Sequence, residues 1–133
     1  ASMPHLSAKE LARQAWKAVS EGDAAALHHL WTEDVVWQAI GNHPWAGRFE
    51  GIEAVLEHIA QIGDSVERFD ARLDEIFASD TRIVYFFHVT AARGARVVGV
   101  DYIMAALHRE GRMSHIWLAA LDPELLESLW NTA

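Results

Sequence analysis

Two residues within the stretch FFHVTAARGARVVGVDY, residues 86–102, have side chains suited to acid–base chemistry: His88 and Asp101. Most of the other residues in this stretch are apolar or small. If Gly94 and Ala95 form a two-residue hairpin loop, pairing counted outward places His88 directly opposite Asp101. Opposed residues share one face of a sheet with Cβ atoms about 5 Å apart, which allows a carboxylate–imidazole hydrogen bond.

An imidazole held by a carboxylate in an apolar cavity has a fixed tautomer and raised basicity, which suits it to accept a proton near neutral pH. Burial acts in the opposite direction and lowers the pKa of a histidine. We interpret His88 as a general base or acid and Asp101 as the residue that orients it. The alternative is a polar pair that only satisfies itself within the core.

Apolar residues of the predicted strands are expected to form the walls of this cavity. Aromatic and aliphatic walls with few polar groups suit a small, flat, apolar ligand. For any single apolar residue, a place in the core is more common than ligand contact. The predicted substrate-binding residues are Trp37, Phe86, Ile103, Ala105, Ile116 and Leu118 on strands, and His43 and Trp45 in a loop at the mouth.

Composition narrows the classes of partner. The net charge of −8 and the scattered basic residues argue against nucleic acid and anionic membranes. The absence of cysteine suits a reducing cytosol, no apolar run approaches the ~18 residues of a membrane span, and no histidine pair has HExxH spacing. We therefore expect a cytoplasmic protein without metal or cofactor, one domain over residues 1–133, with Ala1 and Ser2 interpreted as a cloning scar.

Helical periodicity covers the first half of the chain. Ser7 and Glu10 form a capping box for a helix that runs to Gly22, and Asp23 can cap a short second helix, residues 24–31. Strand residues 34–40 and a loop at 41–51 follow. A third helix begins at 52 and is expected to end with Gly63 in a left-handed conformation.

From residue 69 the apolar period changes to two. A strand that changes phase at Ile76 predicts a bulge, and three further strands follow at 82–93, 96–108 and 112–121. Pro123 opens a short terminal helix. This order predicts an α+β cone, with three N-terminal helices packed in a strongly bent, mostly antiparallel sheet.

Such a sheet is apolar on both faces, while the helices cover only one. We expect the second face to form a homodimer, in which Trp117 anchors the interface. The predicted interface residues are Tyr85, Phe87, Tyr102, Met104, His115 and Trp117.

Several short motifs, in this order, resemble the nuclear transport factor 2-like superfamily and its SnoaL-like branch, which includes polyketide cyclases. They are EGD at 21–23, LWTEDVVW at 30–37, HPWAGRFEG at 43–51, EGRM at 110–113 and ALDPELL at 120–126. The resemblance covers nearly the whole chain and implies a cone fold with a pocket, often dimeric.

The resemblance does not carry over a known set of catalytic residues. Positions used by ketosteroid isomerases hold Ala15, Ala39 and Ile103. The last-strand aspartate of limonene epoxide hydrolases and of SnoaL-type cyclases falls near Leu118, and the cyclase histidine falls near Met104.

The sequence leaves three functional hypotheses. The first is a small enzyme that transfers protons through His88 in an isomerisation, cyclisation or dehydration of an aromatic or polyketide-like substrate. The second is a non-catalytic module that binds a small apolar ligand or mediates dimer contacts. The third and weakest is epoxide hydrolysis, in which Asp101 activates water.

Overall fold

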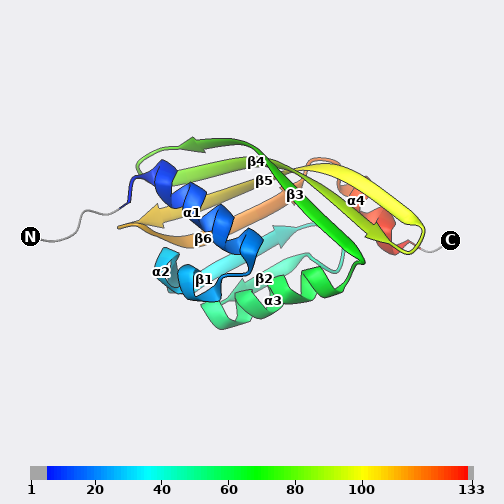
Figure 1. The fold of residues 1–133 in the computed structure, drawn as a ribbon, viewed down its shortest axis with the longest axis horizontal. Coiled ribbons are helices and arrows are strands. Elements are labelled where there is room, and N and C mark those ends of the chain that lie inside the picture. Colours follow the sequence, from blue (N-terminus) through cyan, green and yellow to red (C-terminus); the bar gives the residue numbers. More distant parts are fainter. Residues whose placement is uncertain (1–5, 132–133) are drawn as a thin grey trace, which may run out of the picture.

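The fold is built on one strongly curved sheet with helices on its concave side (Figure 1). The computed structural model describes residues 6–131. The helices are α1 (Ala8–Glu21), α2 (Ala24–Leu30), α3 (Ile52–Asp64), α4 (Pro123–Glu127) and the 3₁₀ turn η1 (Ser128–Trp130). The strands are β1 (Trp31–Ile40), β2 (Gly47–Glu50), β3 (Arg68–Ala78), β4 (Arg82–Arg93), β5 (Arg96–Arg109) and β6 (Arg112–Ala120).

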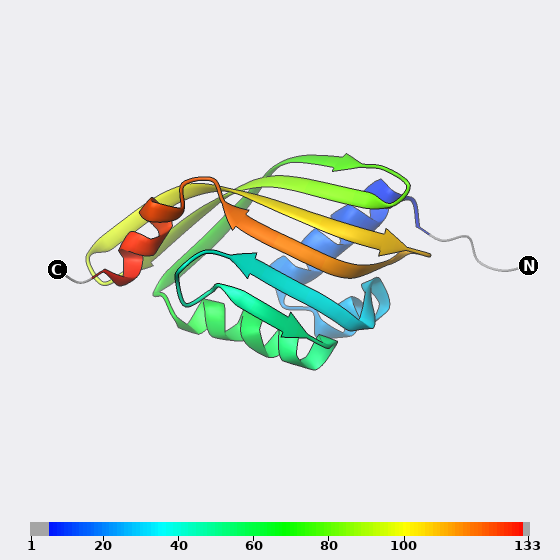
Figure 2. The same cartoon turned by 180° about the vertical axis from the view of Figure 1, so that it is seen from behind.

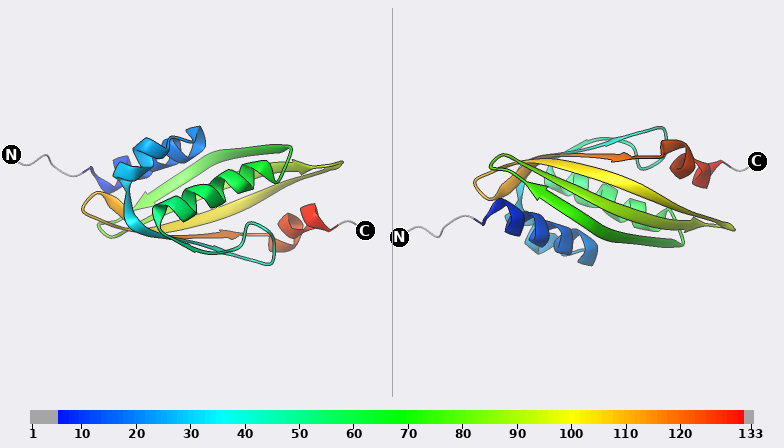
Figure 3. Two further views of the ribbon diagram at one scale, coloured as in Figure 1. Left: turned by 90° about the horizontal axis from the view of Figure 1, so that it is seen from below. Right: turned by 90° about the horizontal axis from the view of Figure 1, so that it is seen from above.

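The six strands lie in the order β2-β1-β6-β5-β4-β3, and every neighbouring pair is antiparallel except β1 and β6. Helices α1, α2 and α3 lie on one side of this sheet, and α4 lies away from α1, against β5 and β6 (Figures 2 and 3). The predicted α+β cone, with three N-terminal helices and a short C-terminal helix, is confirmed.

The ends of the helices follow local chemistry. The Ser7 hydroxyl accepts a hydrogen bond from the Glu10 backbone N–H at 3.2 Å, and Gly22, at φ 67°, closes α1. The predicted left-handed cap at Gly63 is wrong, because this glycine stays helical and Ser65 caps α3 instead. The Ser65 hydroxyl donates a hydrogen bond to the Ile62 carbonyl oxygen, three residues earlier, so the helix end is satisfied without a glycine.

Sequence and structure differ most at the second strand. Residues 41–51 were expected to form a loop, but Gly47–Glu50 pairs with β1 as β2. A strand of four residues is too short to show a period of two. Strand β1 also begins at Trp31, three residues before the expected start.

The long hairpin of β4 and β5 has the predicted register. Arg93 pairs with Arg96, and His88 pairs with Asp101. The predicted irregularity in β3 is confirmed as a register shift between Leu73 and Glu75. A bulge bends the strand that contains it, so this register shift helps β3 to curve around the helices.

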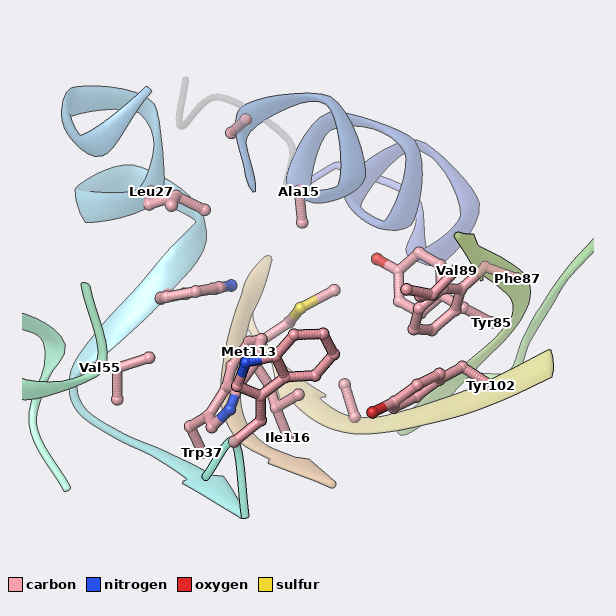
Figure 4. Close-up of a cluster of buried hydrophobic side chains, with 14 of the residues drawn as sticks. Ala15, Leu27, Trp37, Val55, Tyr85, Phe87, Val89, Tyr102, Met113 and Ile116 are labelled. Atoms are coloured by element: carbon pink, nitrogen blue, oxygen red, sulfur yellow. The ribbon is translucent and has the colours of Figure 1, made fainter. Parts of the chain in front are cut away.

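The hydrophobic core fills the space between the helices and the concave sheet face. Alternate residues of β4 and β5, such as Tyr85, Phe87, Val89 and Tyr102, point toward the helices and are nearly inaccessible to solvent (Figure 4). The residues between them face the convex side. This division determines which side chains can reach an internal ligand.

Candidate ligand-binding site

A cavity of about 460 Å³ opens within the cone, between the helices and the concave sheet face. Its walls come from α1, α3, the loop before β2, and strands β1, β3, β4, β5 and β6. The lining residues are Trp16, Val19, Ser20, Trp37, Ala39, Trp45, Ile59, Ile62, Gly63, Phe69, Asp70, Ala71, Phe87, Tyr102, Met104 and Leu118. The size and apolar character suit a small organic molecule.

The exposed lining residues show where the cavity opens. Ser20 and Gly63 lie at the C-terminal ends of α1 and α3, and Phe69, Asp70 and Ala71 lie at the start of β3. Most of the other lining residues are buried or half-buried. The mouth is therefore framed by two helix ends and by the first residues of an edge strand.

Tyr102 supplies a polar group to this apolar space. Its ring stacks on Phe87 with centroids 5.2 Å apart, and its hydroxyl points toward the side of the cluster that holds Trp37 and Ile116 (Figure 4). The hydroxyl makes no hydrogen bond to any of the described residues. Burial raises the pKa of Tyr102, so the phenol stays protonated and can donate a hydrogen bond.

Trp45 forms a fixed wall of the cavity. Its backbone N–H donates to Nδ1 of His43 at 3.2 Å, and its indole N–H donates to the Ser65 hydroxyl at 2.8 Å. Nε2 of His58 lies 3.1 Å from the Trp45 carbonyl oxygen, which can only accept. Three hydrogen bonds thus hold one residue, and the wall is preorganised for a ligand.

His43 supports this wall from behind. Its ring stacks on Trp130 with centroids 6.0 Å apart and meets Trp45 edge-on. Burial lowers the pKa of His43, while a hydrogen bond with the Ile40 backbone and the charge of Glu127 act in the opposite direction. Accepting the Trp45 N–H at Nδ1 requires the neutral imidazole.

The predicted His88–Asp101 pair forms, but not in the cavity. Nδ1 of His88 lies 2.9 Å from Oδ1 of Asp101, with 28% of the histidine side chain and 66% of the aspartate side chain exposed. Both lie on the convex face, opposite the helices. Their predicted placement inside an apolar cavity is therefore wrong, and so is the placement of Asp101 for epoxide hydrolysis.

The predicted cavity walls divide in the same way. Trp37, Trp45 and Leu118 line the cavity as expected. Ile116 faces the concave side but is buried beneath the cavity, and His43 lies behind Trp45. The remaining predicted wall residues, which lie on the convex face with His88, are Phe86, Ile103 and Ala105.

The predicted interface is corrected for the same reason. Tyr85, Phe87, Tyr102 and Met104 point into the cone, where they are core or cavity residues. His115 and Trp117 do lie on the convex face, stacked with ring centroids 3.9 Å apart. A homodimer through this face stays a prediction.

Alternation showed which residues share a face of β4 and β5, but not which face the helices cover. One signal was present: the set that includes Gly99 and Asp101 alternates with the large apolar set of Val98, Val100 and Tyr102. A small or charged residue at every second position indicates the solvent side. Read in this way, the sequence would have placed Tyr102 in the cavity.

The cavity lining holds neither a basic side chain nor a histidine among residues 6–131. Asp70 contributes to the rim, but its carboxylate accepts a hydrogen bond from Arg68 and is 60% exposed, and Phe69 and Ala71 on either side point inward. Across the same part of the chain, no group of three His, Cys, Asp or Glu side chains is arranged to hold a metal. No helix of this region is long and apolar enough to cross a membrane.

A helix-filled cone with an apolar internal pocket defines the class of nuclear transport factor 2-like folds, and solved structures agree. Bal32a, from a soil-derived mobile gene cassette, superposes with a TM-score of 0.84 at 24% identity, covering 92% of this chain and 95% of that one. A nuclear transport factor 2-like protein of Burkholderia xenovorans gives 0.81 at 21% identity, with 92% and 95% covered.

Sequence comparison then gives the family. The model of the SnoaL-like domain matches residues 12–116, and the chain belongs to this family. An uncharacterised protein of Mycobacterium tuberculosis is 25% identical over 126 residues, which covers 91% of this chain and 94% of that protein.

Proposed function

We propose that this protein binds a small, flat, largely apolar molecule inside the cone, with a single polar group of the ligand placed at Tyr102. The observation that carries this proposal is the unpartnered Tyr102 hydroxyl in an otherwise apolar cavity of about 460 Å³. The hydroxyl has no partner among the described residues, so a ligand oxygen or nitrogen in the cavity can form a hydrogen bond with it. The stacked ring of Phe87 holds the phenol in position.

Binding, rather than proton transfer through a histidine–aspartate pair, is supported by the distribution of ionisable groups. His88 and Asp101 lie on the convex face, and the Asp70 carboxylate is turned to solvent. The walls therefore offer shape and a few hydrogen-bonding groups, such as the Tyr102 hydroxyl and the unpartnered Trp37 indole N–H. Among the described residues, the lining contains no imidazole, and its one carboxylate, Asp70, lies at the rim.

The experiment is calorimetric titration of a flat aromatic probe, 2-naphthylmethanol, into the unmodified protein and into two variants in which an alanine is replaced by phenylalanine. Ala71 and Ala78 are both exposed residues of β3, but only Ala71 lines the mouth. Ala71→Phe narrows the opening and is expected to weaken binding at least about tenfold, because a phenyl ring occupies most of a ligand-sized entrance. Ala78→Phe adds the same group outside the cavity and is expected to bind like the unmodified protein.

If the probe fails to bind the unmodified protein, or binds all three proteins equally, the cavity is not its site. Thermal melts of both variants provide the control for folding. Because both alanines are solvent-exposed, each change is expected to shift the free energy of unfolding by less than about 0.5 kcal/mol.

A second candidate function is proton transfer on the bound molecule, in keeping with polyketide cyclases of the same family. A structure named as a SnoaL-like polyketide cyclase from a Jannaschia species superposes with a TM-score of 0.77 at 11% identity and full coverage of both chains. The observation that favours this function is again the Tyr102 hydroxyl, which could stabilise a developing oxyanion. The base would have to come from the substrate or from water. Turnover that falls in Tyr102→Phe by more than affinity falls would support it.

A further inference from the structure

Aromatic residues make up a large share of the cavity walls. Three tryptophans line the cavity: Trp16 from α1, Trp37 from β1 and Trp45 from the loop before β2. They are joined by Phe69, Phe87 and Tyr102 from β3, β4 and β5. Each ring has a negative face, so several rings around one space attract a cation placed among them.

No positive group of the described residues competes for these faces, because the lining contains neither lysine, arginine nor histidine. The Arg68 guanidinium at the rim is turned to Asp70, with Nε bonded to its carboxylate. An anionic ligand would therefore find no counter-charge inside the cavity. Its desolvation would remain uncompensated.

The mouth adds negative potential. Val19 and Ser20 of α1 and Ile62 and Gly63 of α3 line the cavity, so the C-terminal ends of both helices lie beside it. Figure 1 shows both helices running toward the end of the sheet where β3 begins. A helix C-terminus carries a partial negative charge, and neither helix has a basic residue in its last turn to offset it.

Charged residues next to the mouth strengthen this bias. Glu21 and Asp64 are the last residues of α1 and α3, and Glu67 and Asp70 lie at the start of β3. The nearby positive residues are Lys17, one turn before the end of α1, Arg68 and Arg72 of β3, and Arg93 and Arg96 at the β4–β5 turn. Arg68 and Arg72 are each bonded to an aspartate of their own strand, and Arg93 donates to the Leu129 carbonyl oxygen. The whole chain carries a net charge of −8, so the field around the opening favours approach of cations.

We infer that the polar group of the ligand is cationic, and that the site accepts an aromatic or alkyl amine in its ammonium form in preference to a neutral alcohol or a carboxylate. This inference rests on the proposed ligand-binding function. The ammonium group would lie among the tryptophan faces and donate to the Tyr102 hydroxyl oxygen, which can accept as well as donate. The hydrocarbon part would fill the rest of the apolar space.

The test is a matched series of three probes with one ring system: 2-naphthylmethylamine, 2-naphthylmethanol and 2-naphthoate. Each is titrated calorimetrically into the full chain near pH 7, where the amine is charged and the acid is ionised. The amine is expected to bind about three- to tenfold more tightly than the alcohol, as cation–π contacts predict. The carboxylate is expected to bind more weakly than either.

Charge at the mouth is tested with a double variant, Glu21→Gln with Asp64→Asn. It is expected to reduce the advantage of the amine over the alcohol by about two- to fivefold, and salt is expected to reduce it further, because these charges are exposed. The matched control is Asp80→Asn with Glu110→Gln, which removes two charges from the turns at the opposite end of the sheet (Figure 1). The control should leave the preference unchanged.

The outcomes separate this inference from the function on which it rests. If none of the three probes binds, both fail. If the alcohol binds as tightly as the amine, or the carboxylate binds best, the cavity is a ligand site but its preference for cations is refuted. An amine preference that is equal in the two double variants would contradict the role of the mouth.

Discussion

Two buried tyrosines on neighbouring strands allow one sharp test of the site. Tyr85 on β4 and Tyr102 on β5 both point into the cone, and only 0% and 6% of their surfaces are exposed. The Tyr85 hydroxyl donates to the Ala12 carbonyl oxygen at 2.7 Å, whereas the Tyr102 hydroxyl has no partner among the described residues. The same Tyr→Phe change therefore removes an internal hydrogen bond in one case and none in the other.

The expected effects on stability differ accordingly. Tyr85→Phe should lower the free energy of unfolding by about 1 to 2 kcal/mol, the usual cost of a buried hydrogen bond and its unpaired acceptor. For a chain of 133 residues that corresponds to a fall in Tm of about 4–7 °C. Tyr102→Phe should change the free energy of unfolding by less than about 0.5 kcal/mol.

The effects on binding should be reversed. Loss of one hydrogen bond to a ligand, about 0.5 to 1.5 kcal/mol, weakens affinity by about 2- to 13-fold in Tyr102→Phe. Tyr85→Phe should bind the naphthyl probe normally at temperatures where it is folded. Differential scanning calorimetry and isothermal titration measure both quantities on the same preparations. A Tyr102→Phe protein as destabilised as Tyr85→Phe, or with unchanged affinity, would refute the assignment of Tyr102.

The other two predictions concern histidines. His88→Ala is expected to change the free energy of unfolding by less than about 1 kcal/mol in chemical denaturation and to leave probe binding intact, because its aspartate partner is solvated; a loss of binding would return His88 to the site. Burial lowers the pKa of His43 from 6.5, so the imidazole binds a proton more tightly in the unfolded chain than in the folded protein. The stability that comes from neutral His43 is therefore present above pH 6.5. It is lost as the pH falls toward the lower pKa of the folded state. Thermal melts between pH 7.5 and 5.5 should show a smaller loss of stability in His43→Asn than in the unmodified protein. Part of the loss should remain, because burial lowers the pKa of His58 as well. Equal losses in the two proteins would contradict a neutral His43 that accepts the Trp45 N–H.

The order of elements could be predicted because each has a strong local cause. A serine–glutamate capping box began α1, and a glycine in the left-handed region ended it. The two-residue turn at Gly94 determined the register of the central hairpin, down to the hydrogen bond between His88 and Asp101. These features depend on residues close together in the chain.

The site could not be predicted to the same extent, because its position depends on long-range packing. Period two is the same whichever face of a strand is buried, and the choice is made by the helices, which cover Phe87 and leave His88 exposed. The contacts that hold Trp45 likewise join a loop to Ser65 and His58, which lie 13 to 20 residues away. No local pattern predicts such contacts.

The entrance of the cavity is bordered by a strand that has only one neighbour. β3 is the last strand of the sheet and pairs with β4 alone, so its outer backbone edge is free of sheet hydrogen bonds. Residues 69–71 can therefore separate from β4 with the loss of a few hydrogen bonds, while the pairing of the central strands is kept. A ligand could enter as this end of β3 separates from β4 while the other strands stay paired, and amide exchange at β3 should accordingly slow when the ligand is bound.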